Sequence, residues 1–163
     1  MSTWQQGDTS RARRFPLTGE PGVVAHCRDV TRQALREWFG AAGASGLAAV
    51  EDALLLVSEV VTNACTHGGR PYELSLDHTY GRLLVQVSDT SPVRPHPHGP
   101  HRATRSSGHG LYLLDRLSAA WGCLPRSGGK AVWFEVDVRR GPAPEGPGRA
   151  GPVRPPVPPA DRP

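Results

Sequence analysis

One long apolar stretch, residues 47–67, constrains the fold more than any other part of the sequence. Its middle, residues 53–57, places apolar side chains all round a helix, so we expect a buried helix that other elements cover. Ser45 is suited to cap the start of this helix, and Gly68 and Gly69 are suited to end it. The rest of the chain must therefore supply a layer that packs against this helix.

Three polar residues near the end of this stretch, Glu59, Asn63 and His67, lie four positions apart. On a helix this spacing puts them on one face. An asparagine oxygen is a hard, neutral ligand suited to Mg²⁺, and a glutamate one turn away is suited to orient or deprotonate a nucleophile. Taken alone, the stripe also fits an ordinary polar helix face.

The remaining regular segments alternate between helical and strand patterns. Apolar residues at helical spacing predict one helix from Pro21 to Gly40 and another from Gly108 to Leu117. Strands are predicted at residues 13–17, 72–80, 83–87, 119–125 and 131–138, with turns at Gly81 and at 127–129. Helices gathered on one face of a mostly antiparallel sheet make an α/β fold, a two-layer sandwich.

The composition changes at both ends of the chain. The hydrophobic fraction of 37% is low for a wholly folded chain. Residues 1–11 and the Pro, Gly and Arg-rich residues 140–163 are predicted to be disordered, which leaves residues 12–139 as one domain.

Charge and cysteine content narrow the functional classes. The net charge is +4, but residues 21–138 hold 11 Arg or Lys and 11 Asp or Glu. The positive excess therefore lies in the two ends of the chain, and we expect no direct nucleic-acid partner. The N-terminus lacks the apolar stretch of a signal peptide, and no run approaches the roughly 20 apolar residues that a membrane span needs. The sequence therefore predicts no membrane segment. Three cysteines without paired spacing agree with a reducing cytoplasm.

Two further stretches bear residues suited to nucleotide binding. Asp89 leaves a buried strand, and its carboxylate is able to accept a hydrogen bond from an exocyclic amine such as that of adenine. Gly108 and Gly110 open a helix, where backbone amides and the helix dipole favour a phosphate. Each also has an ordinary interpretation, because an Asp before Pro92 often starts a turn.

In this order the stretches resemble the nucleotide-binding (Bergerat) fold of the GHKL ATPase superfamily. Within it they are most similar to the small bacterial anti-sigma factor serine/threonine kinases of the actinobacterial single-domain type. The resemblance covers about residues 15–138. It rests on LLLVSEVVTNACTHG (54–68), VSDTSP (87–92), SGHGLYLLDRLSAAWG (107–122) and GKAVWFEV (129–136).

The resemblance implies ATP and Mg²⁺ as cofactors. Asn63 would coordinate the Mg²⁺ that bridges the phosphates, Glu59 would act as general base or position the attacking hydroxyl, and Asp89 would bind the adenine amine. His67 would be a structural residue at the pocket edge. The residues implied on the phosphate and lid side are Arg105, Gly108, His109, Gly110 and Leu111.

The sequence departs from the family pattern in two places. Asp89 is usually followed by an x-Gly-x-Gly pattern, whereas here Thr90, Ser91 and Pro92 follow. Relatives often have a threonine in the last strand that helps to hold adenine through the aspartate, and we expect Ala131 at that position, which removes a polar contact. Lys130, the only lysine, we attribute to compositional bias rather than to chemistry.

The resemblance implies a cytoplasmic kinase that phosphorylates an anti-sigma-factor antagonist, binds a sigma factor, or does both; members commonly form homodimers. The two departures leave an alternative, a non-catalytic protein-binding regulator gated by ATP. A histidine-kinase catalytic fragment would have to act in trans, because we find no helical dimerisation domain with a phosphoacceptor histidine. The close histidines of the loop permit zinc but have no cysteine nearby, so we interpret them as solvated: His96, His98, His101 and His109.

Overall fold

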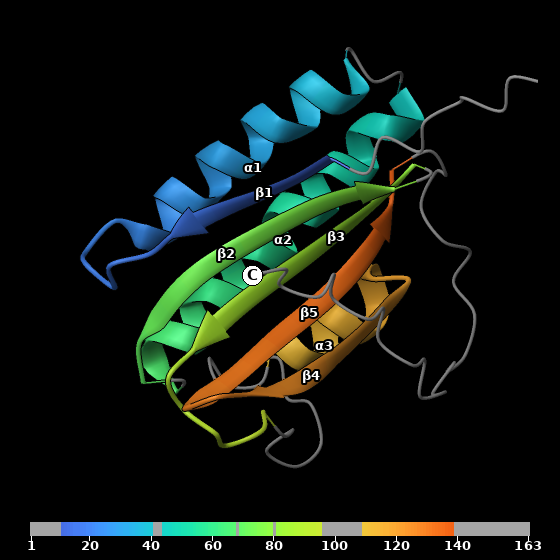
Figure 1. Cartoon of the computed structure of the whole chain (residues 1–163). Coiled ribbons are helices and arrows are strands. Elements are labelled where there is room, and N and C mark those ends of the chain that lie inside the picture. Colours follow the sequence, from blue (N-terminus) through green and yellow to red (C-terminus); the bar gives the residue numbers. More distant parts are fainter. Residues whose placement is uncertain (1–10, 41–43, 68, 80, 96–108, 139–163) are drawn as a thin grey trace, which may run out of the picture.

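The computed structural model describes residues 11–40, 44–67, 69–79, 81–95 and 109–138. In chain order the elements of this part are β1 (Arg11–Pro16), α1 (Val23–Phe39), α2 (Ala44–Thr66), β2 (Pro71–Thr79), β3 (Arg82–Asp89), α3 (His109–Leu117), β4 (Ala120–Arg126) and β5 (Gly129–Asp137). The strands form one layer and the helices a second layer behind it (Figure 1). The prediction of a two-layer α/β sandwich is confirmed.

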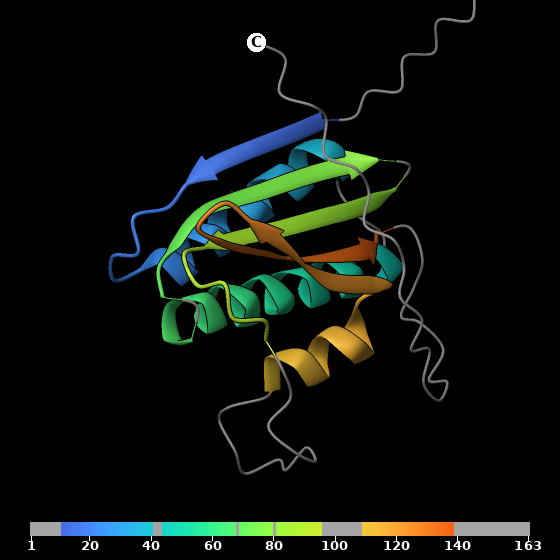
Figure 2. The same ribbon diagram turned by 60° about the horizontal axis from the view of Figure 1, so that its bottom comes forward.

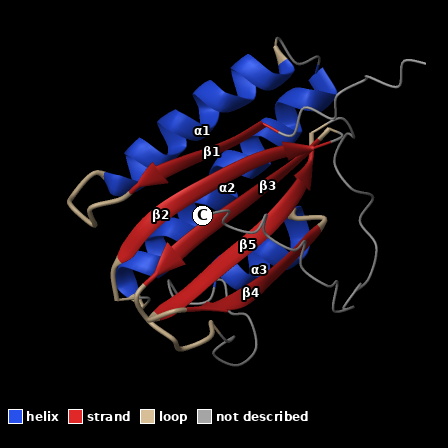
Figure 3. Ribbon diagram, viewed as in Figure 1, coloured by secondary structure: helices blue, strands red, loops and turns tan. Residues whose placement is uncertain are grey.

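The five strands of the described residues form one sheet in the order β1-β2-β3-β5-β4, and all neighbouring strands are antiparallel. All three helices lie on the same face of this sheet (Figure 3). Figure 2 shows α2 beneath the middle of the sheet and α3 beneath its β4–β5 end. Because β5 inserts between β3 and β4, the end of β3 lies beside the start of β5, although about 40 residues separate them in the sequence.

The core lies between the sheet and α2. Residues that alternate along the strands point their apolar side chains towards the helices, as the pleat of a strand requires. The fully buried members on the sheet include Leu74, Leu76, Leu83, Val85 and Phe134. On α2, Ala53, Leu56 and Val57 are fully buried, as expected, but Leu55 is 40% exposed. The middle of α2 is therefore covered on most sides rather than on all of them.

Two predicted boundaries differ from the structure. Helix α2 begins at Ala44, so Ser45 lies inside the helix and does not cap it; alanine is the best helix former and extends the first turn upstream. Strand β1 begins at Arg11, within the segment predicted to be disordered. The other residues of the predicted disordered ends, and the histidines at positions 96–101, lie outside the described residues.

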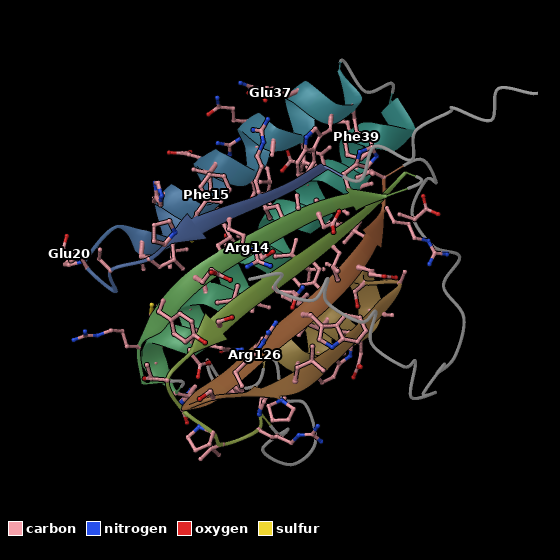
Figure 4. The ribbon with its side chains drawn as sticks, viewed as in Figure 1. Arg14, Phe15, Glu20, Glu37, Phe39 and Arg126 are labelled. Atoms are coloured by element: carbon pink, nitrogen blue, oxygen red, sulfur yellow. The ribbon has the colours of Figure 1, made fainter. Side chains whose placement is uncertain are left out.

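The sheet face opposite the helices carries both polar and apolar residues. One row crosses all five strands and pairs Arg14, Ser75, Gln86, Trp133 and Gly122. Figure 4 shows Arg14 and Arg126 on this face, and Arg126 Nη2 donates a hydrogen bond of 3.2 Å to Gln86 Oε1. None of the described helices is both long and apolar enough to cross a membrane.

Candidate nucleotide-binding site

A cavity of about 250 Å³ opens where β3 ends and β5 begins, between the sheet and helices α2 and α3. Its apolar lining includes Val60 and Ala64 from α2, Leu111 and Leu114 from α3, Val87 and Val132 from the sheet, and Val93 and Pro95 from the loop after β3. Its polar lining consists of Asn63, His67, Asp89, Arg94 and Lys130. A mostly apolar cavity with a few convergent polar groups is typical of a small-molecule site.

Asp89 and Lys130 form the floor of this cavity. The two residues are directly opposite each other in the β3–β5 register, and Lys130 Nζ lies 3.0 Å from Asp89 Oδ1. Their side chains are only 2% and 6% exposed, respectively. Such a buried carboxylate requires partners that offset the loss of water. Lys130 is one partner, and the backbone N–H of Ser91, which donates to the same Oδ1 at 2.9 Å, is the other.

This register corrects the expectation for the last strand. Ala131 is paired with Ser88, one residue away from Asp89, so its side chain lies on the opposite face of the sheet. The residue opposite Asp89 is Lys130, which the sequence analysis attributed to composition. The polar contact expected to be missing at the floor is therefore present, made by an ammonium group.

Gly129 allows β5 to approach Asp89. A Cβ atom at this position would lie 1.9 Å from the carbonyl oxygen of Asp89 and 2.9 Å from its carbonyl carbon. Only glycine fits so close to the backbone of the neighbouring strand, β3. Gly129 was predicted to belong to the turn at 127–129, whereas it is the first residue of β5. The Gly128-Gly129 pair after Ser127 was the only sequence feature that pointed to a close backbone approach, but it did not show which of the two glycines makes the contact.

Asn63 and the start of α3 form another part of the cavity lining. Gly110 is buried in the first turn of α3, and a Cβ atom there would lie 2.4 Å from Asn63 Nδ2 and 3.7 Å from Asn63 Oδ1. The α3 backbone therefore lies directly against the Asn63 amide. The first turn of α3 contains no acidic residue, so no carboxylate of its own occupies the positive end of the helix dipole.

The predicted site residues fall into three groups. Asn63, Asp89 and Leu111 line the same cavity, and Gly110 contacts Asn63. Glu59 is half-buried on α2 and is not among the described residues that line the cavity; within that part of the chain it forms no hydrogen bond or ion pair. Arg105 and Gly108 lie outside the described residues, and of His109 only its place as the first residue of α3 is described.

Arg94 is a further cationic residue at the cavity that the sequence analysis did not single out. Its Nη2 donates a hydrogen bond of 3.2 Å to the carbonyl oxygen of Cys123 on β4. Burial raises the pKa of the Cys123 thiol, and the positive charges of Arg94 and Lys130 act in the opposite direction. No local pattern indicates Arg94, since it stands in a proline-rich loop that approaches the sheet only in the folded chain.

The residues around Asn63 fit a Mg²⁺ ion that arrives with phosphate. Among the described residues, no three His, Cys, Asp or Glu side chains are grouped to hold a metal ion. Mg²⁺ commonly takes one or two protein ligands and completes its shell with water and phosphate oxygens. Asn63 Oδ1 at the cavity is suited to that role, whereas the zinc alternative falls mostly on residues that the structure does not describe.

Comparison with known proteins agrees with this architecture. Residues 21–135 match the family of the histidine kinase-like ATPase domain, while no curated protein matches significantly. The crystal structure of the RsbU and RsbW domains of Rv1364c from Mycobacterium tuberculosis aligns with a TM-score of 0.56 at 17% identity, over 81% of this chain and 33% of that chain. At this identity the likeness shows the fold alone, and this chain spans about one third of that structure's length.

A second structure, the histidine kinase domain from the blue-light activated histidine kinase EL346 of Erythrobacter litoralis, aligns with a TM-score of 0.46 at 19% identity, over 77% of this chain and 66% of that one. The family match covers more than half of the chain and includes all the residues that line the cavity. The chain belongs to the histidine kinase-like ATPase domain family, within the GHKL superfamily.

Proposed function

We propose that the chain is an ATP-binding serine/threonine protein kinase of the anti-sigma-factor type, which phosphorylates a small antagonist protein, binds a sigma factor, or does both. The observation behind this proposal is that Asp89 and Asn63, from different segments of the sequence, line one cavity. The fold likeness to a structure that contains an RsbW domain supports it, as does the family resemblance of the four sequence segments.

Different residues of the cavity suit the adenine base and the phosphates of ATP. At the floor, Asp89 offers a carboxylate to the adenine amine, and the apolar side chains of α2, α3 and β3 cover the base. Asn63 would hold the Mg²⁺ ion through Oδ1, and the positive end of α3 would favour the phosphates. The family resemblance assigns the phosphate side to Arg105, Gly108, His109, Gly110 and Leu111, with the glycines allowing the backbone to approach the phosphates.

In the proposed reaction, the serine hydroxyl oxygen of the partner attacks the γ-phosphorus of ATP. The bond between that phosphorus and the bridging oxygen breaks, ADP leaves, and the hydroxyl proton passes to Glu59. Glu59 lies one helical turn before Asn63, so a substrate at the phosphate end would be within reach of its carboxylate. When bound, Mg²⁺ neutralises charge on the phosphate oxygens.

The proposed working unit is the domain predicted at residues 12–139 together with Arg11, which belongs to β1, with residues 1–10 and 140–163 as disordered tails. The proposed setting is the cytoplasm, where the partners are an antagonist protein, a sigma factor and a second copy of the chain. The formal neutrality of residues 21–138 supports protein partners rather than direct contact with nucleic acid.

The test is phosphoryl transfer from Mg²⁺ and γ-labelled ATP to candidate antagonist proteins. We expect labelling of a serine by the wild-type protein and at least a hundredfold slower transfer by Glu59→Ala, since loss of a general base costs about 10²–10⁴-fold. Glu51→Ala, an exposed acidic residue on the same helix, is the matched control and should transfer at the wild-type rate. Absence of transfer to every candidate would contradict the kinase proposal.

One observation favours a second function, a non-catalytic regulator whose partner affinity depends on ATP. Glu59 is not among the described residues that line the cavity, so a nucleotide there would not need it. This alternative predicts Mg²⁺-ATP binding without transfer or hydrolysis. It also predicts that Glu59→Ala leaves both nucleotide binding and partner binding unchanged, whereas Asn63→Ala weakens both.

A further inference from the structure

The proposed function assigns a role to Asp89 but leaves its partner Lys130 unexplained. Lys130 is the only lysine in the sequence, and it lies at the floor of the cavity with 5% of its surface exposed. Lysine is almost never fully buried unless it is paired. An ion pair of this kind is weak evidence for stability, because well-packed apolar residues often replace such pairs at no cost. Its position therefore raises the question of what the ammonium group does for a ligand.

At the floor, one donor of Lys130 and one acceptor of Asp89 take no part in the hydrogen bonds of the described residues. The lysine ammonium has three N–H donors; one is directed to Asp89 Oδ1 at 3.0 Å and one to the carbonyl oxygen of Ser91 at 3.1 Å. Asp89 Oδ1 accepts from both Lys130 and the Ser91 N–H. Within the described residues, the third ammonium proton and Asp89 Oδ2 have no such partner. Both side chains line the cavity, so the floor presents a donor beside an acceptor.

Adenine has the complementary pair. Its exocyclic amine is a donor, and the two ring nitrogens that flank it, N1 on one edge and N7 on the other, are acceptors. We infer that Lys130 is a specificity-determining residue of the nucleotide site: while Asp89 accepts from the amine, the Lys130 ammonium donates to one of the two flanking ring nitrogens. This inference rests on the proposed ATP site and adds a second contact to the base.

The alternative is that Lys130 has only a structural role, in which it offsets the charge of Asp89 and anchors the loop through Ser91. The two roles differ in one observable. A structural lysine affects the affinity for all adenine nucleotides equally, whereas a lysine that contacts the base makes the affinity depend on the ring nitrogen that it contacts.

The first experiment uses the wild-type full chain and calorimetric titration with Mg²⁺ and ATP, 1-deaza-ATP or 7-deaza-ATP. Each analogue replaces one ring nitrogen by C–H and keeps the amine. We expect one of them to bind about tenfold to a hundredfold more weakly than ATP, as befits a hydrogen bond from a charged donor, and the other to bind within about threefold of ATP. Equal binding of all three nucleotides would overturn the inference and leave the ATP site intact. No binding of any of them would overturn both.

The second experiment repeats these titrations with Lys130→Met, which keeps the length of the apolar stem and removes the ammonium. We expect the difference between ATP and the discriminated analogue to fall to about twofold or less. Arg126→Met, which removes a cation from the helix-free face of the sheet, should keep the full difference. If Lys130→Met keeps it as well, the inference is wrong; if that variant does not fold, the wild-type titrations still decide.

Discussion

Gly129 sets how closely β5 approaches Asp89, and a single methyl group tests this. In Gly129→Ala the new Cβ would meet the Asp89 carbonyl oxygen at 1.9 Å, a backbone atom that is unable to move without breaking the β3–β5 pairing. We expect the free energy of unfolding to fall by about 2–3 kcal/mol, as for overpacked cores. Chemical denaturation monitored by circular dichroism measures it.

Gly128, next to Gly129 in the sequence, provides the control for Gly129→Ala. Gly128 has a positive φ of 76°, but a Cβ atom there would meet nothing within 4 Å. Gly128→Ala should therefore cost only the strain of the left-handed backbone, about 1–2 kcal/mol. A loss for Gly129→Ala no greater than that for Gly128→Ala would mean that the close approach at the floor does not constrain the sheet.

Gly110 makes a second close contact, with a side chain rather than with backbone. In Gly110→Ala the new Cβ would meet Asn63 Nδ2 at 2.4 Å, and the Asn63 amide is able to rotate away. Alanine is also favoured over glycine in a helix by about 1 kcal/mol. We expect Tm to stay the same or rise slightly, while the affinity for Mg²⁺-ATP measured by calorimetry falls about tenfold, because the proposed metal ligand is displaced.

The double variant Asn63→Ala/Gly110→Ala shows whether this loss acts through Asn63. If it does, the double variant should bind Mg²⁺-ATP as weakly as Asn63→Ala alone, since effects on one shared contact do not add. Additive losses would mean that Gly110→Ala disturbs the phosphate end of the cavity by another route.

At the scale of the elements, periodicity was sufficient to predict the helices, the hairpins and the polar stripe on α2, because it follows from local geometry. Register was harder to predict. A shift of one residue moves a side chain to the opposite face of a strand, and this is why Ala131 was expected where Lys130 lies. The pairing of Asp89 with Lys130 depends on where the Ser127–Gly128 turn sets β5 against β3, which no local pattern in either strand specifies.

The packing of α1 against α2 predicts a loss of stability at high pH. Cys27 on α1 is fully buried, and burial together with the nearby Cys65 raises the pKa of its thiol from 9.0 to about 11. Because the folded-state pKa lies above the unfolded-state value, the stabilising contribution is complete below pH 9 and is lost as the pH rises through 11. Between these values Cys27 should account for a loss of about 2–3 kcal/mol.

Denaturation of the wild type and of Cys27→Ala at several pH values from 8 to 11 measures this contribution, since other titrating groups are common to both proteins. The difference in free energy of unfolding should shift in favour of Cys27→Ala as the pH rises. Cys65→Ala, which removes an exposed thiol, should show a much smaller shift. A pH-independent difference for Cys27→Ala would contradict the assignment.

At the scale of the whole molecule, the cavity exists only because three distant segments meet. Asn63, Asp89 and Leu111, which the sequence singled out for nucleotide binding, all line this cavity, and each stands at the end or start of a recognisable element. Lys130 and Arg94 were missed; their positions follow from strand order and from a loop that returns to the sheet. Glu59 differs from these residues: its spacing from Asn63 predicted a shared helix face, and it is not among the described residues that line the cavity, so its proposed role stays a prediction.

A ligand that binds only the folded state must stabilise the whole domain, so nucleotide binding should appear as a shift in unfolding. At an ATP concentration of about 100 times its Kd, with Mg²⁺ present, the free energy of unfolding should rise by about 2.7 kcal/mol. For a domain of this size this corresponds to a rise in Tm of roughly 10 °C. Asn63→Ala and Asp89→Asn, which both change the lining of the cavity, should each reduce the rise at the same ATP concentration, whatever their own Tm without nucleotide. Asp29→Asn, on the exposed side of α1, should keep it in full. A rise of equal size in all four proteins would mean that ATP binds elsewhere, because a ligand in this cavity depends on both lining residues.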